Sequence, residues 1–284
     1  FRIERTAALK SPLRYPGGKS RAIKVIKDFI PQDTKKLASP FLGGGSLELY
    51  FASIGVEVSA YDLFQPLCWF WKALLEDPSS LADKSDSYRN YGGYTDKNNI
   101  NLRGLSKADF LKLREFLSEQ ETYSITAAAA FYALNRSSFS GETLSGGYSK
   151  QAAHTRFTDS SIKRIREFDA ANFTVQNKSF EDSIGENEDA FLYCDPPYLL
   201  ERGNNLYGKS GDMHKEFDHE LLRDILGQRA GWVLSYNDSE IIRKMYDGYR
   251  IIPLSWAYGM KNVKKKSSKK KKMGKSSEIL ILNN

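Results

Sequence analysis

The sequence is poor in the residues that build metal sites and disulfide frameworks. Its 284 residues include two cysteines, Cys68 and Cys194, and three histidines. Both cysteines lie within or beside apolar sequence, so we expect two buried free thiols rather than a disulfide, which suits a reducing compartment. The histidines and cysteines show no metal-ligand spacing, and we therefore predict no metal.

Long apolar runs are also missing. No stretch approaches 18 consecutive apolar residues, so we expect no membrane span. The first four residues do not resemble a secretory signal. They lack Met, so we expect that the true first residues are missing or processed. We expect an intracellular protein, cytoplasmic in a bacterium and nuclear in a eukaryotic host, with enough chain to bury a full core.

Acidic residues are absent from the segment between Lys261 and Lys275, which contains nine lysines. The net charge of the chain is +7, and subtracting these nine lysines leaves −2 for the rest. The segment lies between two strand-like stretches, 251–254 and 278–281, so it is expected to be the loop of a hairpin. Its lysines would bind phosphates, or form a solvated loop or a nuclear-import-like run.

Apolar periodicity alternates between strand and helix along the chain. Strand-like segments are expected at 56–61, 173–177, 191–194, 232–235, 251–254 and 278–281, and helices at 20–30, 47–54, 64–76, 106–117, 122–135, 158–168 and 218–226. Residues 77–105 read as polar and turn-rich, and 136–157 as a β-hairpin or loop. This alternation predicts an α/β fold with a largely parallel, doubly wound sheet. We expect a catalytic domain formed by 1–76 and 161–284, with 77–160 inserted.

The segment 191–198 reads Phe-Leu-Tyr-Cys-Asp-Pro-Pro-Tyr and is the most informative part of the chain. Its apolar half fits a buried strand, which the prolines must end because they lack N–H groups and fix φ. The Asp195 carboxylate and the Pro196 carbonyl should then leave the sheet edge beside the Tyr198 ring. Two acceptors beside a stacking ring suit a planar base with an exocyclic amine. The simpler alternative is a turn with a solvated Asp195.

A glycine-rich turn, residues 40–46, reads Pro-Phe-Leu-Gly-Gly-Gly-Ser and precedes a predicted helix. Glycine allows a ligand to approach the backbone closely, and the free N–H groups of the helix start favour a nucleotide-like ligand. Asp62 ends the next strand about 17 residues after Gly45, a spacing that suits a carboxylate accepting both ribose hydroxyls. An ordinary turn and a helix-capping aspartate are the alternatives.

Near the start, Gly18-Lys19-Ser20 looks like the end of a phosphate-binding P-loop. That motif needs a glycine five residues before its final glycine, and Leu13 occupies this position. No apolar strand precedes it, so the P-loop interpretation fails.

Together these motifs resemble the Dam-like D12 class of DNA adenine methyltransferases, within the alpha group of amino-methyltransferases that act on adenine N6 or cytosine N4. The resemblance runs from about Leu13 to the C-terminus and is weak between about Glu76 and Ser124. It implies a Rossmann-like methyltransferase sheet with an inserted, mostly helical target-recognition module and hairpin, and S-adenosylmethionine as cofactor. It implies that the catalytic motif is Asp195, Pro196, Pro197 and Tyr198.

The same resemblance implies cofactor-binding roles for residues of four segments. They are Tyr15, Gly18, Lys19, Pro40, Phe41, Gly43, Gly44, Gly45, Ser46, Asp62, Phe180 and Asp182. Lys19 would lie near the cofactor carboxylate, Tyr15 would line its pocket, and Phe180 would pack on its adenine, with Asp182 near the adenine amine. The chain departs from the family at Ser39, where members often carry Glu, and at Tyr61, where they carry Asn. Residues 235–238 resemble a motif that shapes the target pocket, although a polar turn is the alternative.

Residues 134–142 resemble the family's DNA-contacting hairpin, whose aromatic residue can wedge into stacked bases. The DNA contacts implied are Asn135, Arg136, Phe139, Ser140, Glu142 and Arg156. Lys163, Arg164 and Arg166 would add phosphate contacts. Members that modify GATC carry an apolar residue and then Arg after the hairpin glycine, where this chain has Glu142 and Leu144, so its target need not be GATC. Glu142 would accept a hydrogen bond from cytosine N4 or would face solvent. For Arg136, a structural role is the alternative to DNA contact.

The sequence therefore predicts a monomeric, S-adenosylmethionine-dependent enzyme that methylates adenine N6 in duplex DNA after base flipping. A restriction-modification or DNA-marking role, with a companion restriction endonuclease as a further partner, fits this class. Cytosine N4, RNA or protein glutamine as substrate, and a DNA-binding module with a decayed cofactor pocket, are the alternatives.

Overall fold

The computed structural model describes residues 9–15, 19, 22–199, 217–254 and 278–283. Among these residues, no helix combines the length and apolarity that a membrane crossing requires. The Lys261–Lys275 loop, Gly18 and the residues just after Leu199 lie outside the described part of the chain.

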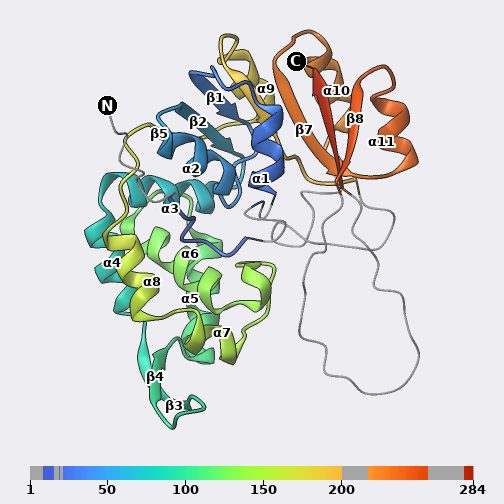
Figure 1. Cartoon of the computed structure of the whole chain (residues 1–284). Helices are drawn as coiled ribbons and strands as arrows, with labels where there is room; N and C mark the ends of the chain where they lie inside the picture. The colour runs from blue at the N-terminus through green and yellow to red at the C-terminus, as the bar shows by residue number, and fades with distance from the viewer. Residues whose placement is uncertain (1–8, 16–18, 20–21, 200–216, 255–277, 284) are drawn as a thin grey trace, which may run out of the picture.

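The centre of the fold is a seven-stranded sheet in the order β5-β2-β1-β6-β7-β9-β8 (Figure 1). The strands are β1 (Lys36–Ser39), β2 (Glu57–Asp62), β5 (Phe173–Asn177), β6 (Phe191–Cys194), β7 (Trp232–Asn237), β8 (Arg250–Leu254) and β9 (Glu278–Asn283). The first five strands of this order pair in parallel, and β9 runs antiparallel to both β7 and β8. The predicted doubly wound α/β class and the C-terminal strand pair are confirmed.

Strand order reverses between β1 and β6. From β1 the chain moves to β2 on one side, whereas from β6 it moves to β7 on the other. In open α/β sheets this switch leaves a crevice outside the carboxyl ends of the strands, where ligands bind. The ends of β1 and β6 are therefore the expected position of a site.

Two hydrophobic clusters cover the two faces of the sheet. In β9, Ile279 and Ile281 belong to one cluster, and Leu280 and Leu282 belong to the other. This alternation follows from the two-residue period of a strand and explains an unbroken apolar run in a strand buried on both faces. The helices that accompany the sheet are α1 (Ile23–Ile26), η2 (Lys27–Phe29), α2 (Ser46–Ser53), α3 (Gln65–Glu76), α9 (Phe180–Gly185), α10 (His219–Gly227) and α11 (Glu240–Met245).

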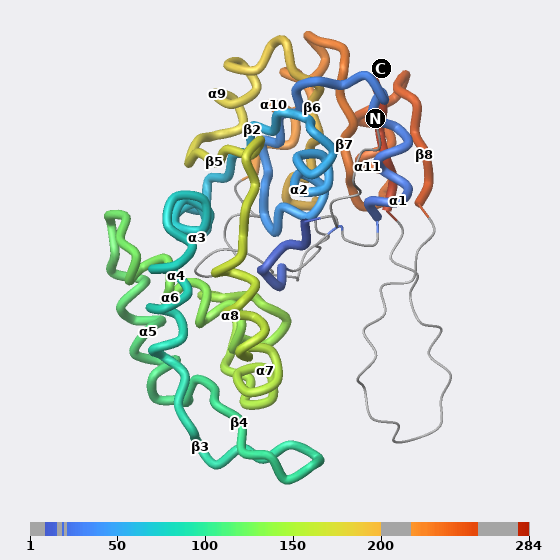
Figure 2. The backbone as a smooth tube through the Cα atoms, turned by 60° about the vertical axis from the view of Figure 1, so that its left-hand side comes forward, coloured from blue at the N-terminus to red at the C-terminus, as the bar shows by residue number. Residues whose placement is uncertain are grey.

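Between α3 and β5 the chain leaves the sheet and forms a mostly helical unit (Figure 1). It contains α4 (Pro78–Asp86), β3 (Asn90–Thr95), β4 (Asn101–Gly104), α5 (Lys107–Glu119), α6 (Ile125–Ser137), η3 (Phe139–Gly141), α7 (Lys150–Thr155) and α8 (Asp159–Arg166). Helix α6 is buried from Ala127 to Ser137 and packs on α3, α4 and α5. The β3–β4 hairpin projects away from the sheet in both views (Figure 2).

Three predictions of local structure were wrong. Residues 77–105 are not merely turn-rich, because Asp77 accepts from the Ser80 N–H and Pro78 begins α4, both strong helix-start signals. Residues 136–157 are not a hairpin throughout: one isolated bridge joins Ser138 to Tyr148, and helix α7 follows. The helix expected at 20–30 is, where described, one α-helical turn followed by a 3₁₀ turn.

Candidate active site

Asp195 directly follows β6 and is held at both carboxylate oxygens. The Ser235 hydroxyl on β7 donates to Oδ1 over 2.7 Å, and the Lys19 ammonium lies 2.8 Å from Oδ2. Because β6 and β7 are adjacent parallel strands, their carboxyl ends meet, and this brings Ser235 to Asp195. The carboxylate is therefore fixed in direction before any ligand binds.

Tyr198 lies in the same cluster. Its hydroxyl accepts from Lys19 over 2.9 Å and donates to Glu278 Oε1 over 2.9 Å. Lys19 is 4.0 Å from that Glu278 oxygen and 5.1 Å from the centre of the Tyr198 ring. Lys19 thus joins the two ends of the Asp-Pro-Pro-Tyr motif to the first residue of β9.

The glycine-rich turn is tied to the next strand by Asp62. The N–H of Gly43 donates to Asp62 Oδ2 and the N–H of Phe64 donates to Oδ1, each over 2.9 Å. Burial raises the pKa of the Asp62 carboxyl, although these N–H groups act against the shift. Asp62 therefore fixes the conformation of the turn and its connection to β2.

The turn is also packed tightly from both sides. A Cβ added at Gly44 would lie 2.8 Å from Cβ of Tyr15, and one added at Gly45 would lie 2.8 Å from the Trp71 ring. The Trp71 indole N–H donates to the Gly43 carbonyl over 3.3 Å. Gly45 has φ +64°, a left-handed conformation that favours glycine. Tyr15 and the glycines, predicted to share a pocket, lie in contact.

Phe180 and Phe41, both predicted beside the cofactor, lie in one aromatic cluster. Their ring centres are 5.7 Å apart, and Phe217 lies 5.6 Å from Phe41 and 5.3 Å from Phe180. Asp182 is exposed, and its N–H and carboxylate both bond to the Ser179 hydroxyl. Sequence reasoning missed Phe217, which follows a segment with no clear pattern. Pro40 is buried at the end of β1, and Ser46 begins α2.

Two buried acids near Asp195 also escaped sequence reasoning. Glu48 on α2 and Glu278 on β9 are 2% and 5% exposed. Each is the lone acid in an apolar run, Leu-Glu-Leu and Glu-Ile-Leu-Ile, and this is the signal that could have found them. The Ser39 hydroxyl donates to Glu48 Oε1 over 2.7 Å.

The predicted DNA-contacting residues divide into buried and exposed groups. Asn135 is fully buried and bonds to the N–H and carbonyl of Arg14, and Arg136 donates to the carbonyls of Arg156 and Pro12. A direct DNA contact would require these two side chains to leave their internal bonds. In this structure they anchor the loop after α6 to the N-terminal segment.

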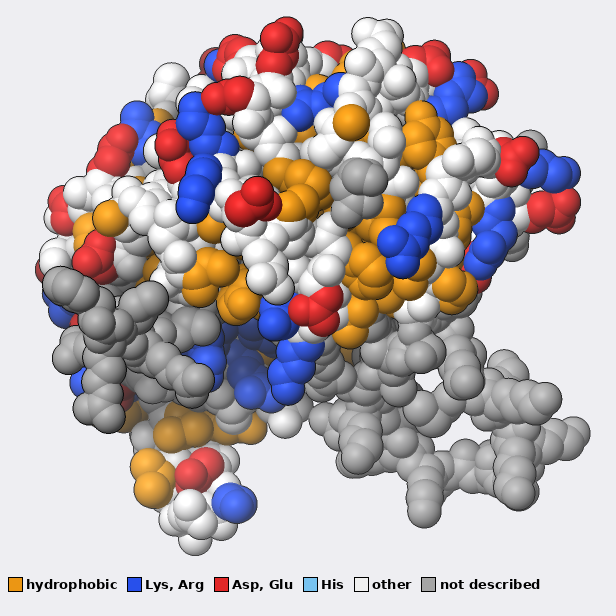
Figure 3. Space-filling view, turned by 45° about the horizontal axis from the view of Figure 1, so that its top comes forward, with side chains coloured by type: hydrophobic (Ala, Val, Ile, Leu, Met, Phe, Trp, Pro, Cys, Tyr) orange, Lys and Arg blue, Asp and Glu red, His pale blue; other side chains and the backbone are white. Residues whose placement is uncertain are grey.

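The tip of that loop is exposed to solvent. Phe139 is 66% exposed, and Ser140 has φ +55°. Glu142 is partly buried, which raises the pKa of its carboxyl, and the Arg156 side chain is exposed. On the face in Figure 3, Lys and Arg side chains gather in a recess on the lower part of the molecule.

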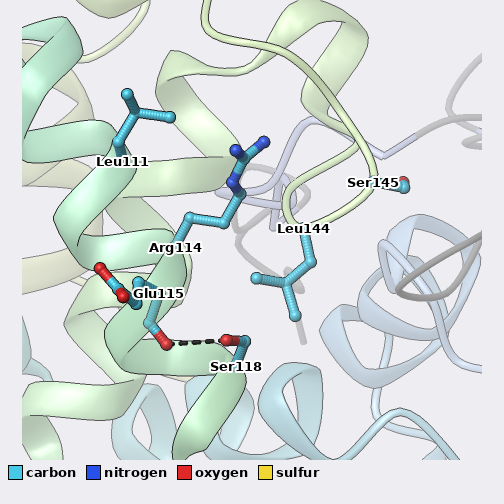
Figure 4. A pocket seen from close by; sticks show the side chains of 6 residues that line it. All are labelled: Leu111, Arg114, Glu115, Ser118, Leu144 and Ser145. Atoms are coloured by element: carbon cyan, nitrogen blue, oxygen red, sulfur yellow. Dashed lines mark hydrogen bonds between the residues drawn. The ribbon is translucent and has the colours of Figure 1, made fainter.

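A groove of about 580 Å³ lies beside the same loop (Figure 4). Its lining residues are Leu111, Arg114, Glu115 and Ser118 of α5, with Leu144 and Ser145 of the loop. The groove belongs to the inserted unit and not to the strand ends that carry Asp195. Across the described residues, no group of three or more His, Cys, Asp or Glu side chains is arranged to hold a metal ion.

The reversed strand order, the glycine turn after β1 and the acidic motif after β6 define a Rossmann-like methyltransferase architecture. The chain belongs to the family of D12 class N6 adenine-specific DNA methyltransferases, whose model matches residues 15–260. This confirms the resemblance inferred from the motifs.

Two relatives illustrate the similarity. The chain is 25% identical over 268 residues to the "DNA N-6-adenine-methyltransferase" of Escherichia phage P1, covering 86% of this chain and 32% of that protein. It is 22% identical over 255 residues to the "DNA adenine methylase" of Vibrio cholerae serotype O1, covering 84% of this chain and 85% of that protein. The chain therefore spans about a third of the phage protein and most of the Vibrio protein.

Proposed function

We propose that the chain is a DNA methyltransferase that transfers a methyl group from S-adenosylmethionine to adenine N6 in duplex DNA. The observation that carries the proposal is the junction of β1 and β6. There the glycine-rich turn, Asp62, Asp195 and Tyr198 share one end of the sheet, with Lys19 bonded to the last two.

The residues present suit the cofactor. The turn requires glycine at Gly44 and Gly45 because an added Cβ would collide with Tyr15 or Trp71, and glycine lets a ligand approach the backbone closely. Asp62 would accept from the ribose hydroxyls, and the aromatic cluster of Phe41 and Phe180 would pack on the adenine. When bound, S-adenosylmethionine supplies a methyl group activated by its sulfonium.

The target base must leave the duplex, as a base inside the stack cannot reach a protein pocket. Tyr198 would stack on the extruded adenine. The Asp195 carboxylate and the Pro196 carbonyl would accept the two N6 hydrogens. This would orient the nitrogen lone pair toward the methyl group. Transfer, with loss of one N6 proton to solvent and release of the demethylated cofactor, would then need no covalent enzyme intermediate. Rate acceleration would come from orientation and fixed charge.

The inserted unit, residues 77–160, would read the DNA. Phe139 is exposed and would wedge into the stack, and the exposed Arg156 would contact phosphate. We propose a monomer acting on duplex DNA inside the cell, in a restriction-modification or DNA-marking role, with a companion endonuclease in the former case.

The test is methyl transfer from labelled S-adenosylmethionine to mixed-sequence duplex DNA, followed by digestion to nucleosides. We expect label in N6-methyladenine. Label in N4-methylcytosine would overturn the base assignment, and absence of label from DNA would move the search to RNA or protein substrates. Asp195→Ala should abolish transfer yet retain cofactor binding, whereas the matched surface variant Asp189→Ala should behave as wild type. Wild-type turnover in Asp195→Ala would overturn the mechanism.

A further inference from the structure

The buried Glu48 carboxylate has no part in the mechanism above, although it lies close to the groups that do. It projects from the first turn of α2, directly after the glycine-rich turn, and is 2% exposed. Its Oε1 accepts from the Ser39 hydroxyl at the end of β1 over 2.7 Å. Ser39 itself is fully buried.

The position of Ser39 gives this contact its meaning. Ser39 ends β1 immediately before Pro40 and Phe41, so its bond ties the Glu48 carboxyl to the strand end that leads into the glycine-rich turn.

The charges around Glu48 are unbalanced. Three carboxyl groups, those of Glu48, Asp195 and Glu278, gather around Lys19, which is bonded to Asp195 and lies 4.0 Å from Glu278. Within the described part of the chain, Lys19 is the cation whose charge acts on Glu48, and the Asp195 charge opposes it. A buried excess of negative charge favours a cationic ligand.

S-adenosylmethionine carries a sulfonium and an ammonium against one carboxylate, so it has a net positive charge. Its demethylated product lacks the sulfonium and is neutral overall. A buried carboxylate behind the glycine-rich turn therefore distinguishes the two molecules by charge, even without contact, because interaction across a poorly solvated site is weakly screened.

We propose that Glu48 is a positioning residue that favours binding of cationic S-adenosylmethionine over its neutral product. The inference rests on the proposed use of this cofactor. Glu48 acts through the field it sets up beneath the turn and through its bond to Ser39, not by touching the reacting atoms.

The titration of Glu48 gives this role a signature. Burial raises the pKa of the Glu48 carboxyl to about 7, with the Asp195 charge adding to the shift and Ser39 and Lys19 opposing it. Tyr193 on β6 also faces Glu48, and burial raises the pKa of its hydroxyl well above the ordinary value, so it stays neutral. Asp62 at the end of β2 is the other acid of the turn. A cationic ligand would lower the pKa of Glu48 and release protons near pH 7.

The test is calorimetric binding of S-adenosylmethionine and of its demethylated product to the full chain, in buffers of different ionisation enthalpy. For the wild type we expect tighter binding of the methyl donor from pH 6 to 8, with release of up to about half a proton at pH 7. Glu48→Gln keeps an acceptor for Ser39 but loses the charge. It should weaken binding of the methyl donor by about tenfold, weaken product binding less, and abolish the proton release.

Glu57→Gln, an exposed acid on β2, is the matched control and should bind as wild type. Circular dichroism establishes that each variant is folded.

The outcomes separate the two proposals. If the wild type binds no S-adenosylmethionine, both the proposed function and the proposed role of Glu48 are overturned. If the wild type binds and Glu48→Gln matches it in affinity and proton release, only the role of Glu48 is overturned.

Discussion

The Lys19 ammonium lies 2.8 Å from the Asp195 carboxylate, across 176 positions of sequence, and donates to the Tyr198 hydroxyl as well. The lysine side chain is 5% exposed and that of Asp195 is 21% exposed. An ion pair so placed is strongly coupled, since removing one partner leaves the other charge with little solvent. Asp195, the acid expected to bind the target amine, is therefore already bonded to Lys19, the residue expected to lie near the cofactor.

Lys19→Met removes the charge and keeps most of the side-chain volume. We expect it to lower the free energy of unfolding by about 3 kcal/mol, because Asp195 and Glu278 lose their shared cation. The same change in an Asp195→Asn background should cost clearly less. Urea unfolding of the four proteins measures this coupling, with Lys24→Met as the exposed control. Equal losses in both backgrounds would show that the pair is not coupled.

Tyr198→Phe separates the hydroxyl from the ring. The variant loses the bonds to Lys19 and Glu278 but keeps the stacking surface, so turnover should fall by no more than about tenfold. Tyr198→Ala loses the ring and should fall by about a hundredfold, as stacking on a base contributes about 1–3 kcal/mol. Steady-state kinetics on duplex DNA measures both. If turnover by Tyr198→Phe were as low as that by Tyr198→Ala, the contribution of Tyr198 would come from its hydroxyl and not from stacking of its ring.

Gly45→Ala tests the close packing of the turn. Alanine would meet Trp71 at 2.8 Å and would adopt φ +64°, so we expect a loss of about 2–4 kcal/mol in the free energy of unfolding. Gly55 also has positive φ, +92°, but nothing lies within 4 Å of an added Cβ. Gly55→Ala should therefore cost about 1 kcal/mol from backbone strain alone. Equal losses of unfolding free energy in the two variants would mean that the Trp71 side chain can move aside at no energetic cost.

Phe139→Ala tests the wedge. Phe139 is 66% exposed, so its loss should leave the thermal midpoint unchanged and lower kcat/KM on duplex DNA by about tenfold. Tyr91 on the β3–β4 hairpin is 69% exposed and serves as the matched aromatic control. We expect Tyr91→Ala to retain wild-type kinetics. Comparable defects in both variants would assign the effect to general surface hydrophobicity.

The stability of the ligand-free protein should depend on pH through Glu48. Its pKa is raised from 4.5 to about 7 on folding, so the folded state holds the proton more tightly than the unfolded state. This contribution is complete below pH 4.5 and is lost as pH rises toward 7, a loss of about 3 kcal/mol. Denaturation of wild type and Glu48→Gln across this range should show the difference, and parallel curves would contradict it.

Local signals in the sequence predicted the fold well where one residue determines the structure. Ser106 and Asp218 begin α5 and α10 by accepting from N–H groups three residues ahead, as their types suggest. The strand 191–194 was predicted at its observed bounds because the prolines that follow must end it. Helix α4 was missed, because its polar composition concealed the capping Asp77.

The site was predicted less completely, for a physical reason. Sequence patterns placed Asp195 and the glycine turn at strand ends, and parallel pairing of β1 and β6 brings these ends together. Which cation binds Asp195, and which acids share it, depends on side chains from β7, β9 and the N-terminal segment meeting in three dimensions. Because these side chains come from segments far apart in the sequence, no local periodicity of the sequence predicts their contacts.

The contact between Trp71 and the glycine-rich turn has an optical consequence. The indole lies beneath Gly45 and donates to the Gly43 carbonyl, so its emission depends on the dipoles of that turn. A ligand that reorders the turn will change the fluorescence of a ring it never touches. The protein thus carries its own spectroscopic reporter, and Trp71→Phe identifies which part of the signal belongs to it.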